Sequence, residues 1–67
     1  MIEIITEKEK AILAVKNDGL ALEHASDELK ADKEVVMAAV KENGYALRYA
    51  HEKLQDDDDL ISAGGEV

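Results

Sequence analysis

The apolar residues of this chain recur at steps of three and four positions, a spacing that places side chains on one face of an α-helix. Four such stripes follow one another along the chain: Ala11, Ile12, Ala14 and Val15; Ala21, Leu22, Ala25 and Leu29; Val36, Met37, Ala39 and Val40; Ala46, Leu47, Ala50 and Leu54. The pattern predicts four short amphipathic helices, at about residues 7–17, 20–29, 33–42 and 45–54.

Polar residues and glycines between the stripes indicate where each helix begins and ends. Thr6 followed by Glu9 is a capping box for the first helix, and Asp32 is a typical N-cap for the third. Gly19 and Gly44 each follow a polar residue at the end of a stripe. Glycine adopts the left-handed conformation at little steric cost, so we expect both glycines to end their helices in that conformation.

The chain also contains an internal repeat. A shift of 25 positions aligns residues 8–32 with residues 33–57 without a gap, and 11 of the 25 aligned pairs are identical. The identical pairs include Lys8/Lys33, Val15/Val40, Gly19/Gly44, Leu29/Leu54 and Asp32/Asp57. We refer to the two segments as unit 1 and unit 2. Because two short helices cannot bury their apolar stripes alone, the repeat predicts two tandem helical hairpins that stack on each other.

The register of the repeat continues after unit 2. Residues 57–61 stand 25 positions after residues 32–36, so Asp57 is the expected N-cap of a partial third helix. We place this helix at residues 58–63, as a cap over unit 2, and expect residues 64–67 to form a frayed tail. The aspartates from 56 to 59 are consecutive, whereas a calcium loop alternates its ligands, so the run is interpreted as a helix cap and first turn.

The register also extends before unit 1. Ile4 stands 25 positions before Leu29 and 50 before Leu54, as though it closed an earlier unit. Ile2 and Ile5 flank it. We therefore expect these three isoleucines to cover the outer side of unit 1.

Length and composition bound the remaining possibilities. The 67 residues fit one small domain, residues 1–67, and the absence of cysteine excludes disulfides and thiol chemistry. The longest apolar run, residues 35–40, is far shorter than the ~20 residues of a membrane span. We expect a soluble, cytoplasmic protein without a membrane partner.

The net charge of −8 is unevenly distributed. Residues 1–55 carry eight basic and eleven acidic groups, whereas residues 56–67 carry no basic and five acidic groups. The repeats are thus only mildly acidic, but they contain no basic patch. Nucleic acid is therefore not an expected partner.

Residues 32–50 carry a family resemblance. Asp32, the pair Val35-Val36, Asn43-Gly44 and Ala46-Leu47 resemble the repeats of the domain-of-unknown-function family numbered 4116. Unit 1 matches less closely, since Lys10-Ala11 replaces the hydrophobic pair and Asp18 replaces the asparagine. The resemblance covers about residues 6–62. It implies small all-helical units in tandem, without an assigned activity and without catalytic residues.

Candidate groups for chemistry are few. His24 lies within one helical turn of Asp27 and Glu28, but a zinc site needs three or four ligands. His24, Ser26 and Asp27 have the residue types of a hydrolase triad, yet residues two apart on a helix point to different sides. We expect no enzymatic activity, no cofactor and no metal site. The alternative is an accessory domain that binds a ligand or metal through His24 and nearby carboxylates.

Tyr45 and Tyr49, the only aromatic residues, lie about one turn apart, with Arg48 between them. Tyrosine and arginine are common anchors of protein interfaces, so these three residues form the candidate interaction surface. The alternative is that the rings cover the edge of the core and leave their hydroxyls in water.

The sequence thus predicts a small all-α protein of four short helices in two hairpins, plus a short C-terminal helix. Gly19, Gly44, Asp32 and Asp57 are its predicted turn and cap residues. A ubiquitin-binding three-helix fold is a weaker alternative, because its Met-Gly-Phe type of loop is missing. The expected role is a non-enzymatic interaction or scaffold module with a protein partner, as a monomer or weak homo-oligomer.

Overall fold

The computed structural model describes residues 7–64, and every regular element in that range is helical. In chain order the elements are α1 (Glu7–Asn17), the 3₁₀-helix η1 (Gly19–His24), α2 (Asp27–Lys30), α3 (Lys33–Glu42), the 3₁₀-helix η2 (Gly44–Tyr49), α4 (Glu52–Gln55) and α5 (Asp58–Gly64). The predicted all-α class is confirmed. The order of α-helix, 3₁₀-helix and short α-helix occurs in unit 1 and again in unit 2.

The longest helices, α1 and α3, have the predicted bounds. Asp32 caps α3, since its Oδ1 accepts a hydrogen bond from the Glu34 N–H at 2.9 Å. Helix α3 buries four residues, Val35, Val36, Ala39 and Val40, whereas α1 buries only Val15. The difference arises because α3 lies between α1 and α5 and is covered on both sides.

The prediction of one continuous second helix in each unit is wrong. In each unit two residues separate the 3₁₀-helix from a one-turn α-helix, and the first of them, Ala25 in unit 1 and Ala50 in unit 2, is extended. The next residue caps that α-helix. Ser26 Oγ accepts a hydrogen bond from the Leu29 N–H at 3.3 Å, and His51 Nδ1 accepts one from the Lys53 N–H at 3.0 Å. These side chains stabilise a new helix start, so the chain changes direction there.

The prediction that Gly19 and Gly44 end helices in the left-handed conformation is also wrong. Neither has a positive φ, and each begins a 3₁₀-helix. The polar residue before each glycine caps that 3₁₀-helix: Asp18 Oδ1 accepts from the Leu20 N–H at 3.0 Å, and Asn43 Oδ1 accepts from the Tyr45 N–H at 2.9 Å.

The two glycines are needed for close approach between elements. A Cβ added to Gly19 would lie 2.5 Å from the carbonyl oxygen of Ala39 in α3. A Cβ added to Gly44 would overlap the carbonyl of Gly64 in α5. Gly64 stands 25 positions after Ala39, so the same contact recurs at the next step of the repeat.

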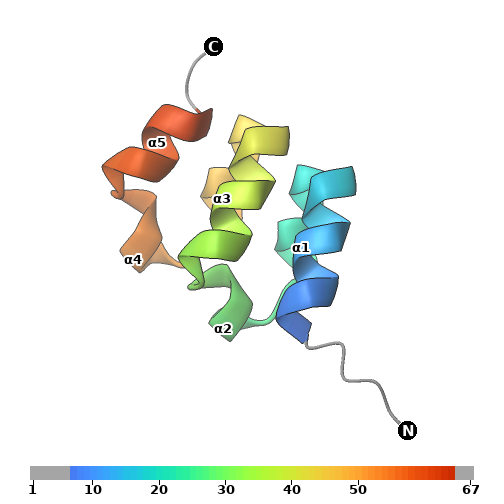
Figure 1. Ribbon diagram of the computed structural model, residues 1–67. Coiled ribbons are helices and arrows are strands. Elements are labelled where there is room, and N and C mark those ends of the chain that lie inside the picture. The colour runs from blue at the N-terminus through green and yellow to red at the C-terminus, as the bar shows by residue number, and fades with distance from the viewer. Residues whose placement is uncertain (1–6, 65–67) are drawn as a thin grey trace, which may run out of the picture.

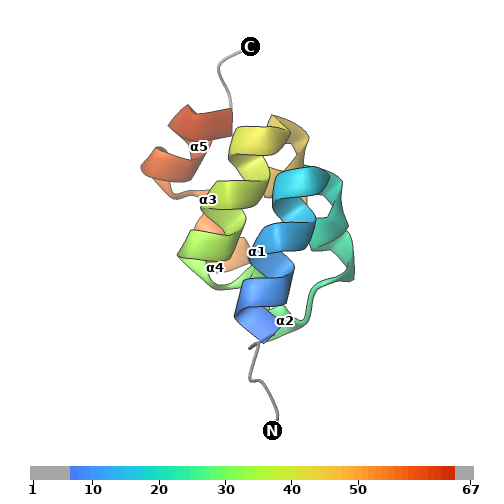
Figure 2. The same cartoon turned by 45° about the vertical axis from the view of Figure 1, so that its right-hand side comes forward.

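The helices form two layers around one core. Figure 1 shows α1, α3 and α5 side by side in one row with α3 in the middle, and Figure 2 shows the same row from a second direction. Behind this row, η1 and η2 pack against each other, and η1 also contacts α1 and α3. The buried residues are Val15, Leu22, Val35, Val36, Ala39, Val40, Ala46, Ala50, Leu54 and Leu60. Within residues 7–64, no polar or charged side chain is buried.

Helix α5 covers α3 and η2, where the repeat predicts a partial third helix. Its Leu60 is fully buried, and the neighbouring Ile61 is exposed by 44%. The prediction that the frayed tail begins at residue 64 is wrong, because Gly64 packs against Gly44 and belongs to the helix. Residues 65–67 lie outside the described range, as do Ile2, Ile4 and Ile5.

Candidate functional site

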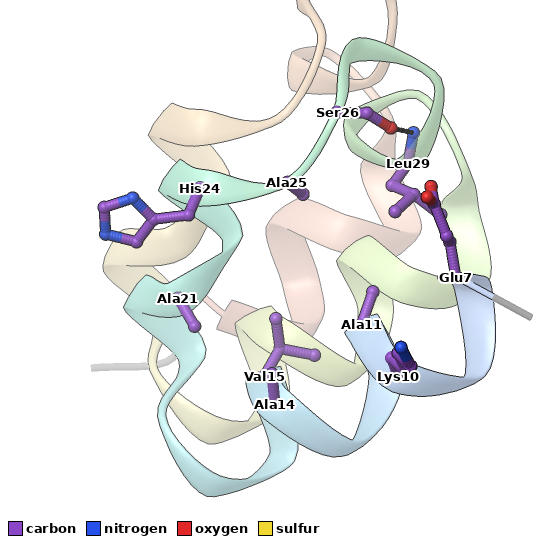
Figure 3. A pocket seen from close by; sticks show the side chains of 10 residues that line it. All are labelled: Glu7, Lys10, Ala11, Ala14, Val15, Ala21, His24, Ala25, Ser26 and Leu29. Carbon is purple, nitrogen blue, oxygen red and sulfur yellow. Dashed lines mark hydrogen bonds between the residues drawn. The ribbon is translucent and has the colours of Figure 1, made fainter. Parts of the chain in front are cut away.

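A shallow, open groove of about 570 Å³ lies between α1, η1 and α2 of unit 1 (Figure 3). Small apolar side chains make up most of its surface, and polar side chains stand at its edges. The apolar residues are Ala11, Ala14, Val15, Ala21, Ala25 and Leu29, and the polar ones are Glu7, Lys10, His24 and Ser26. Alanine dominates because α1 and η1 approach each other closely here. The groove therefore offers an apolar surface with few hydrogen-bonding groups.

The polar side chains of the groove do not converge on one point. Figure 3 shows the His24 imidazole pointing outward, away from Ser26, whose hydroxyl is bonded to the Leu29 N–H. Among residues 7–64, no three His, Cys, Asp or Glu side chains lie close enough together to hold a metal ion. The groove thus has no arrangement of a nucleophile, a base and an orienting group.

A second candidate surface is the exposed side of η2. The guanidinium carbon of Arg48 lies 4.6 Å from the centre of the Tyr45 ring, a cation–π contact. Residues three apart are in line on a 3₁₀-helix, which brings these two side chains together. Tyr49 is four positions from Tyr45 and so turns to another side, where its half-buried ring packs against the core. We refer to Tyr45 and Arg48 as the aromatic pair.

Two equivalent ion-pair clusters join successive steps of the repeat, the first between unit 1 and unit 2 and the second between unit 2 and α5. Lys8 Nζ lies 3.3 Å from Asp32 Oδ2 and 2.9 Å from Glu34 Oε1. Twenty-five positions later, Lys33 Nζ lies 3.2 Å from Asp57 Oδ2 and 2.9 Å from Asp59 Oδ2. The sequence signal for these pairs was the identity of Lys8 with Lys33 and of Asp32 with Asp57. The role predicted for the aspartates from sequence is that of helix caps only.

Asp57 has both roles in the structure. Its Oδ1 accepts a hydrogen bond from the Asp59 N–H at 2.9 Å, as predicted for the N-cap of α5. Its Oδ2 pairs with Lys33. Partial burial by itself raises the pKa of Asp57, but the hydrogen bonds from Lys33 and from the backbone N–H groups of Asp59 and Leu60 outweigh it and lower the pKa.

These clusters predict how stability depends on pH. The hydrogen bond to Asp59 and then that to Asp57 raise the pKa of Lys33 above 10.5, so its stabilisation is lost as the pH rises through the folded-state value. The pKa of Asp57 is lowered from 3.8, so its contribution is present at neutral pH and is lost as the pH falls below that value. Thermal unfolding between pH 2 and pH 11 should show a plateau with a decline at each end.

The matched control for this pH profile is a variant with Lys8→Met and Lys33→Met. It removes both cations but keeps their apolar stems, so its melting temperature should depend less on pH at both ends. Added salt should likewise affect the variant less than the unmodified protein, because exposed ion pairs are screened. Identical pH profiles for the two proteins would contradict a role for these clusters in stability.

One further contact joins the units. The Gly19 N–H, at the start of η1, donates a 2.6 Å hydrogen bond to Glu42 Oε1 from the end of α3. This bond ties the first 3₁₀-helix to unit 2. Nothing in the sequence pattern marked Glu42, because its position in unit 1 is occupied by Asn17.

Comparison with known proteins gives a family and no activity. The model of a family described as "Domain of unknown function (DUF4116)" matches residues 7–61. No curated protein and no solved structure matches the chain. Among the described helices, none has the length and apolar character needed to cross a membrane.

Proposed function

Because this chain belongs to the DUF4116 family, whose description names no activity, we propose its function from its own surface: a non-enzymatic module that binds a protein partner. The groove and the aromatic pair both support a binding role, since each presents apolar area to solvent. The separation of His24 from Ser26 supports the absence of catalysis (Figure 3).

The single observation that carries this proposal is the exposure of the Tyr45 ring. Tyr45 is 62% exposed, whereas Tyr49 of the same 3₁₀-helix is half-buried against the core. Arg48 lies against the exposed ring at 4.6 Å. The pair is thus held in place before a partner arrives, which reduces the entropy cost of binding. Tyrosine and arginine are also enriched among the residues that dominate interface energies.

The chemistry of the aromatic pair indicates what kind of partner surface it fits. A guanidinium stacked on a ring still directs its N–H groups outward in its own plane, where they can form paired hydrogen bonds to a carboxylate. The rest of the Tyr45 ring offers apolar contact. We therefore propose a partner that presents an acidic side chain beside an apolar one.

The combined substitution Tyr45→Ala and Arg48→Ala tests this surface. Purified partners from an extract of the source cells should bind the variant at least about tenfold more weakly than the unmodified protein. The fold should be unaffected, because both side chains are exposed. Affinity is measured by calorimetry after the partner has been identified by pull-down.

Leu13→Ala is the matched control, because Leu13 is 66% exposed and lies on α1. It should leave affinity unchanged. If both variants retain the partner equally, or if the unmodified protein captures none, the proposed function is wrong.

A further inference from the structure

A second groove, of about 560 Å³, lies between α1 and α3. The described residues that line it all belong to these two helices, which lie side by side and run in the same direction (Figure 1). Its apolar side chains are half-buried: Ile12, Met37 and Ala38. Its basic side chains are exposed: Lys16, Lys33 and Lys41. We refer to it as the lysine groove. The fold thus gathers at one apolar surface lysines that form no basic run in the sequence.

The two ends of the lysine groove differ in charge. At the end where the helices begin, Lys33 and Glu34 are both held in the ion-pair clusters between successive steps of the repeat. At the end where the helices finish, Lys16 and Lys41 form no ion pair with any residue between 7 and 64. The positive charges of these two lysines can therefore pair with a negatively charged ligand.

The repeat arranges the unpaired lysines in register with the apolar part of the groove. Lys16 and Lys41 stand 25 positions apart, and so do Ile12 and Met37. Each lysine follows its apolar residue by four positions, which is about one turn of an α-helix. The helix dipole favours a lysine in any last turn, but it does not place an apolar residue one turn earlier. The groove thus presents two apolar side chains next to two ammonium groups.

The next interface of the repeat, between α3 and α5, has different chemistry. The residues 25 positions after Lys33 and Met37 are Asp58 and Ser62, and both belong to α5. A negatively charged ligand would be repelled by Asp58 and would meet a hydroxyl in place of the methionine side chain. Stacking of helices therefore does not by itself produce the lysine groove, and the charge difference confines an acidic ligand to the first interface.

We propose that the lysine groove binds an acidic amphipathic helix of another protein. Apolar side chains of that helix contact Ile12 and Met37, and its carboxylates pair with Lys16 and Lys41. Two helices offer no strand edge to an extended peptide, whereas an amphipathic helix can place its apolar face between them. Charge complementarity sets the orientation of the bound helix, because only one end of the groove has unpaired lysines.

Other occupants fit less well. Nucleic acid is bound mainly through its phosphates, and the apolar part of the groove would gain nothing from them. Glu34 also lines the groove and would repel a phosphate backbone. A second copy of the chain carries the same net charge of −8, so the two molecules repel each other.

The lysine groove is separate from the aromatic pair. Tyr45 and Arg48 lie on η2, and the residues that line the groove lie on α1 and α3. Binding at the groove therefore does not depend on the contact proposed for the aromatic pair, and either can be lost without the other.

The first test is a nuclear magnetic resonance titration of the unmodified protein. The probe is a synthetic peptide of about 15 residues, long enough to form a helix, with leucine at every third or fourth position and glutamate on the opposite face. The signals of Ile12, Met37 and Ala38 should shift, and those of Tyr45 should not. Unchanged groove signals at about 1 mM peptide would overturn the proposal. Shifts of the same signals on dilution of the protein alone would assign the groove to a second copy and would also overturn it.

The second test removes the unpaired charges. The combined substitution Lys16→Gln and Lys41→Gln should weaken peptide binding about fivefold to tenfold, as measured by calorimetry, without affecting the exposed surface elsewhere. The matched control is Lys10→Gln with Lys53→Gln, which changes the net charge equally at exposed lysines that do not line this groove. The control should bind within about twofold of the unmodified protein. Equal losses in the two variants would overturn the proposal, because they would show attraction by net charge alone.

The third test changes the ligand. Polyglutamate of the same length and a single-stranded oligonucleotide should each bind at least about tenfold more weakly than the amphipathic peptide, since neither fills the apolar part of the groove. Equal binding of polyglutamate, or tighter binding of the oligonucleotide, would overturn the proposal. The variant with Tyr45→Ala and Arg48→Ala should bind the amphipathic peptide as the unmodified protein does, so failure at one surface is distinguishable from failure at the other.

Discussion

Replacement of Gly44 by alanine is expected to destabilise the protein by about 2–3 kcal/mol. The added Cβ would overlap the carbonyl oxygen of Gly64 and lie 2.8 Å from its carbonyl carbon. Both are backbone atoms, so α5 would have to move as a whole and would carry the buried Leu60 with it. A domain of this length has a total stability of about 3–10 kcal/mol, so the substitution should lower the melting temperature by about 10–20 °C.

Gly44→Asn separates this steric cause from a conformational one. Asparagine tolerates the left-handed conformation better than alanine, so it would partly restore stability if that conformation were required. Because Gly44 has no positive φ, asparagine should be at least as harmful as alanine. Gly19→Ala should also destabilise, since its Cβ would lie 2.5 Å from the Ala39 oxygen. A stable Gly44→Ala protein would contradict the close contact between η2 and α5.

The two glycines show where prediction from sequence succeeds and where it stops. The ends of α1 and α3 were predicted correctly, at Asn17 and Glu42 shortly before the two glycines, because a helix-stop pattern is local. The purpose of the two glycines was predicted wrongly, because the reason for glycine here lies in Ala39 and Gly64, residues that approach from another element. The residues next to a glycine in the sequence do not show which backbone segment of another element packs against it.

The second helices illustrate a different limit. The apolar spacing of Ala21, Leu22, Ala25 and Leu29 fits one continuous helix, yet the structure breaks it at Ala25. Ser26 caps a new helix before Asp27 and Glu28, a helix start that the apolar periodicity does not predict. A 3₁₀-helix has three residues per turn instead of 3.6, and over six residues the two periods are hard to distinguish. Packing between η1 and η2 decides between them.

The type of helix, α or 3₁₀, also determines which residues form the candidate interaction surface. On an α-helix, Tyr45, Arg48 and Tyr49 would share one side, which is how they were predicted. On η2 the first two remain together and Tyr49 packs against the core. Exposure of Tyr45 was predictable from its position beyond the apolar stripe, whereas the direction of Tyr49 depended on the helix type.

Leu60→Ala should have the largest effect of any single side-chain truncation in α5. Leu60 is fully buried, with a solvent-exposed fraction of 0%, and it occupies the repeat position that Val35 occupies in unit 2. Removal of a fully buried leucine side chain costs about 2–5 kcal/mol, which comprises the lost burial and the cavity left behind. Chemical denaturation should therefore show a midpoint far below that of the unmodified protein.

Ile61→Ala is the internal control, since this neighbour in the same helix is 44% exposed and its truncation should cost less than about 1 kcal/mol of stability.

Deletion of residues 57–67 extends the comparison, because it removes the Asp57 cap, the Lys33 ion pairs and Leu60 together. The deletion exposes the side of α3 and η2 that α5 covers, so the shortened chain should unfold or associate, as measured by circular dichroism and sedimentation. If Leu60→Ala and Ile61→Ala lose equal stability, or if the shortened chain remains a monomer of unchanged stability, α5 does not close the core. The graded order expected is Ile61→Ala, then Leu60→Ala, then the deletion, because each step removes more of the area that α5 buries against unit 2.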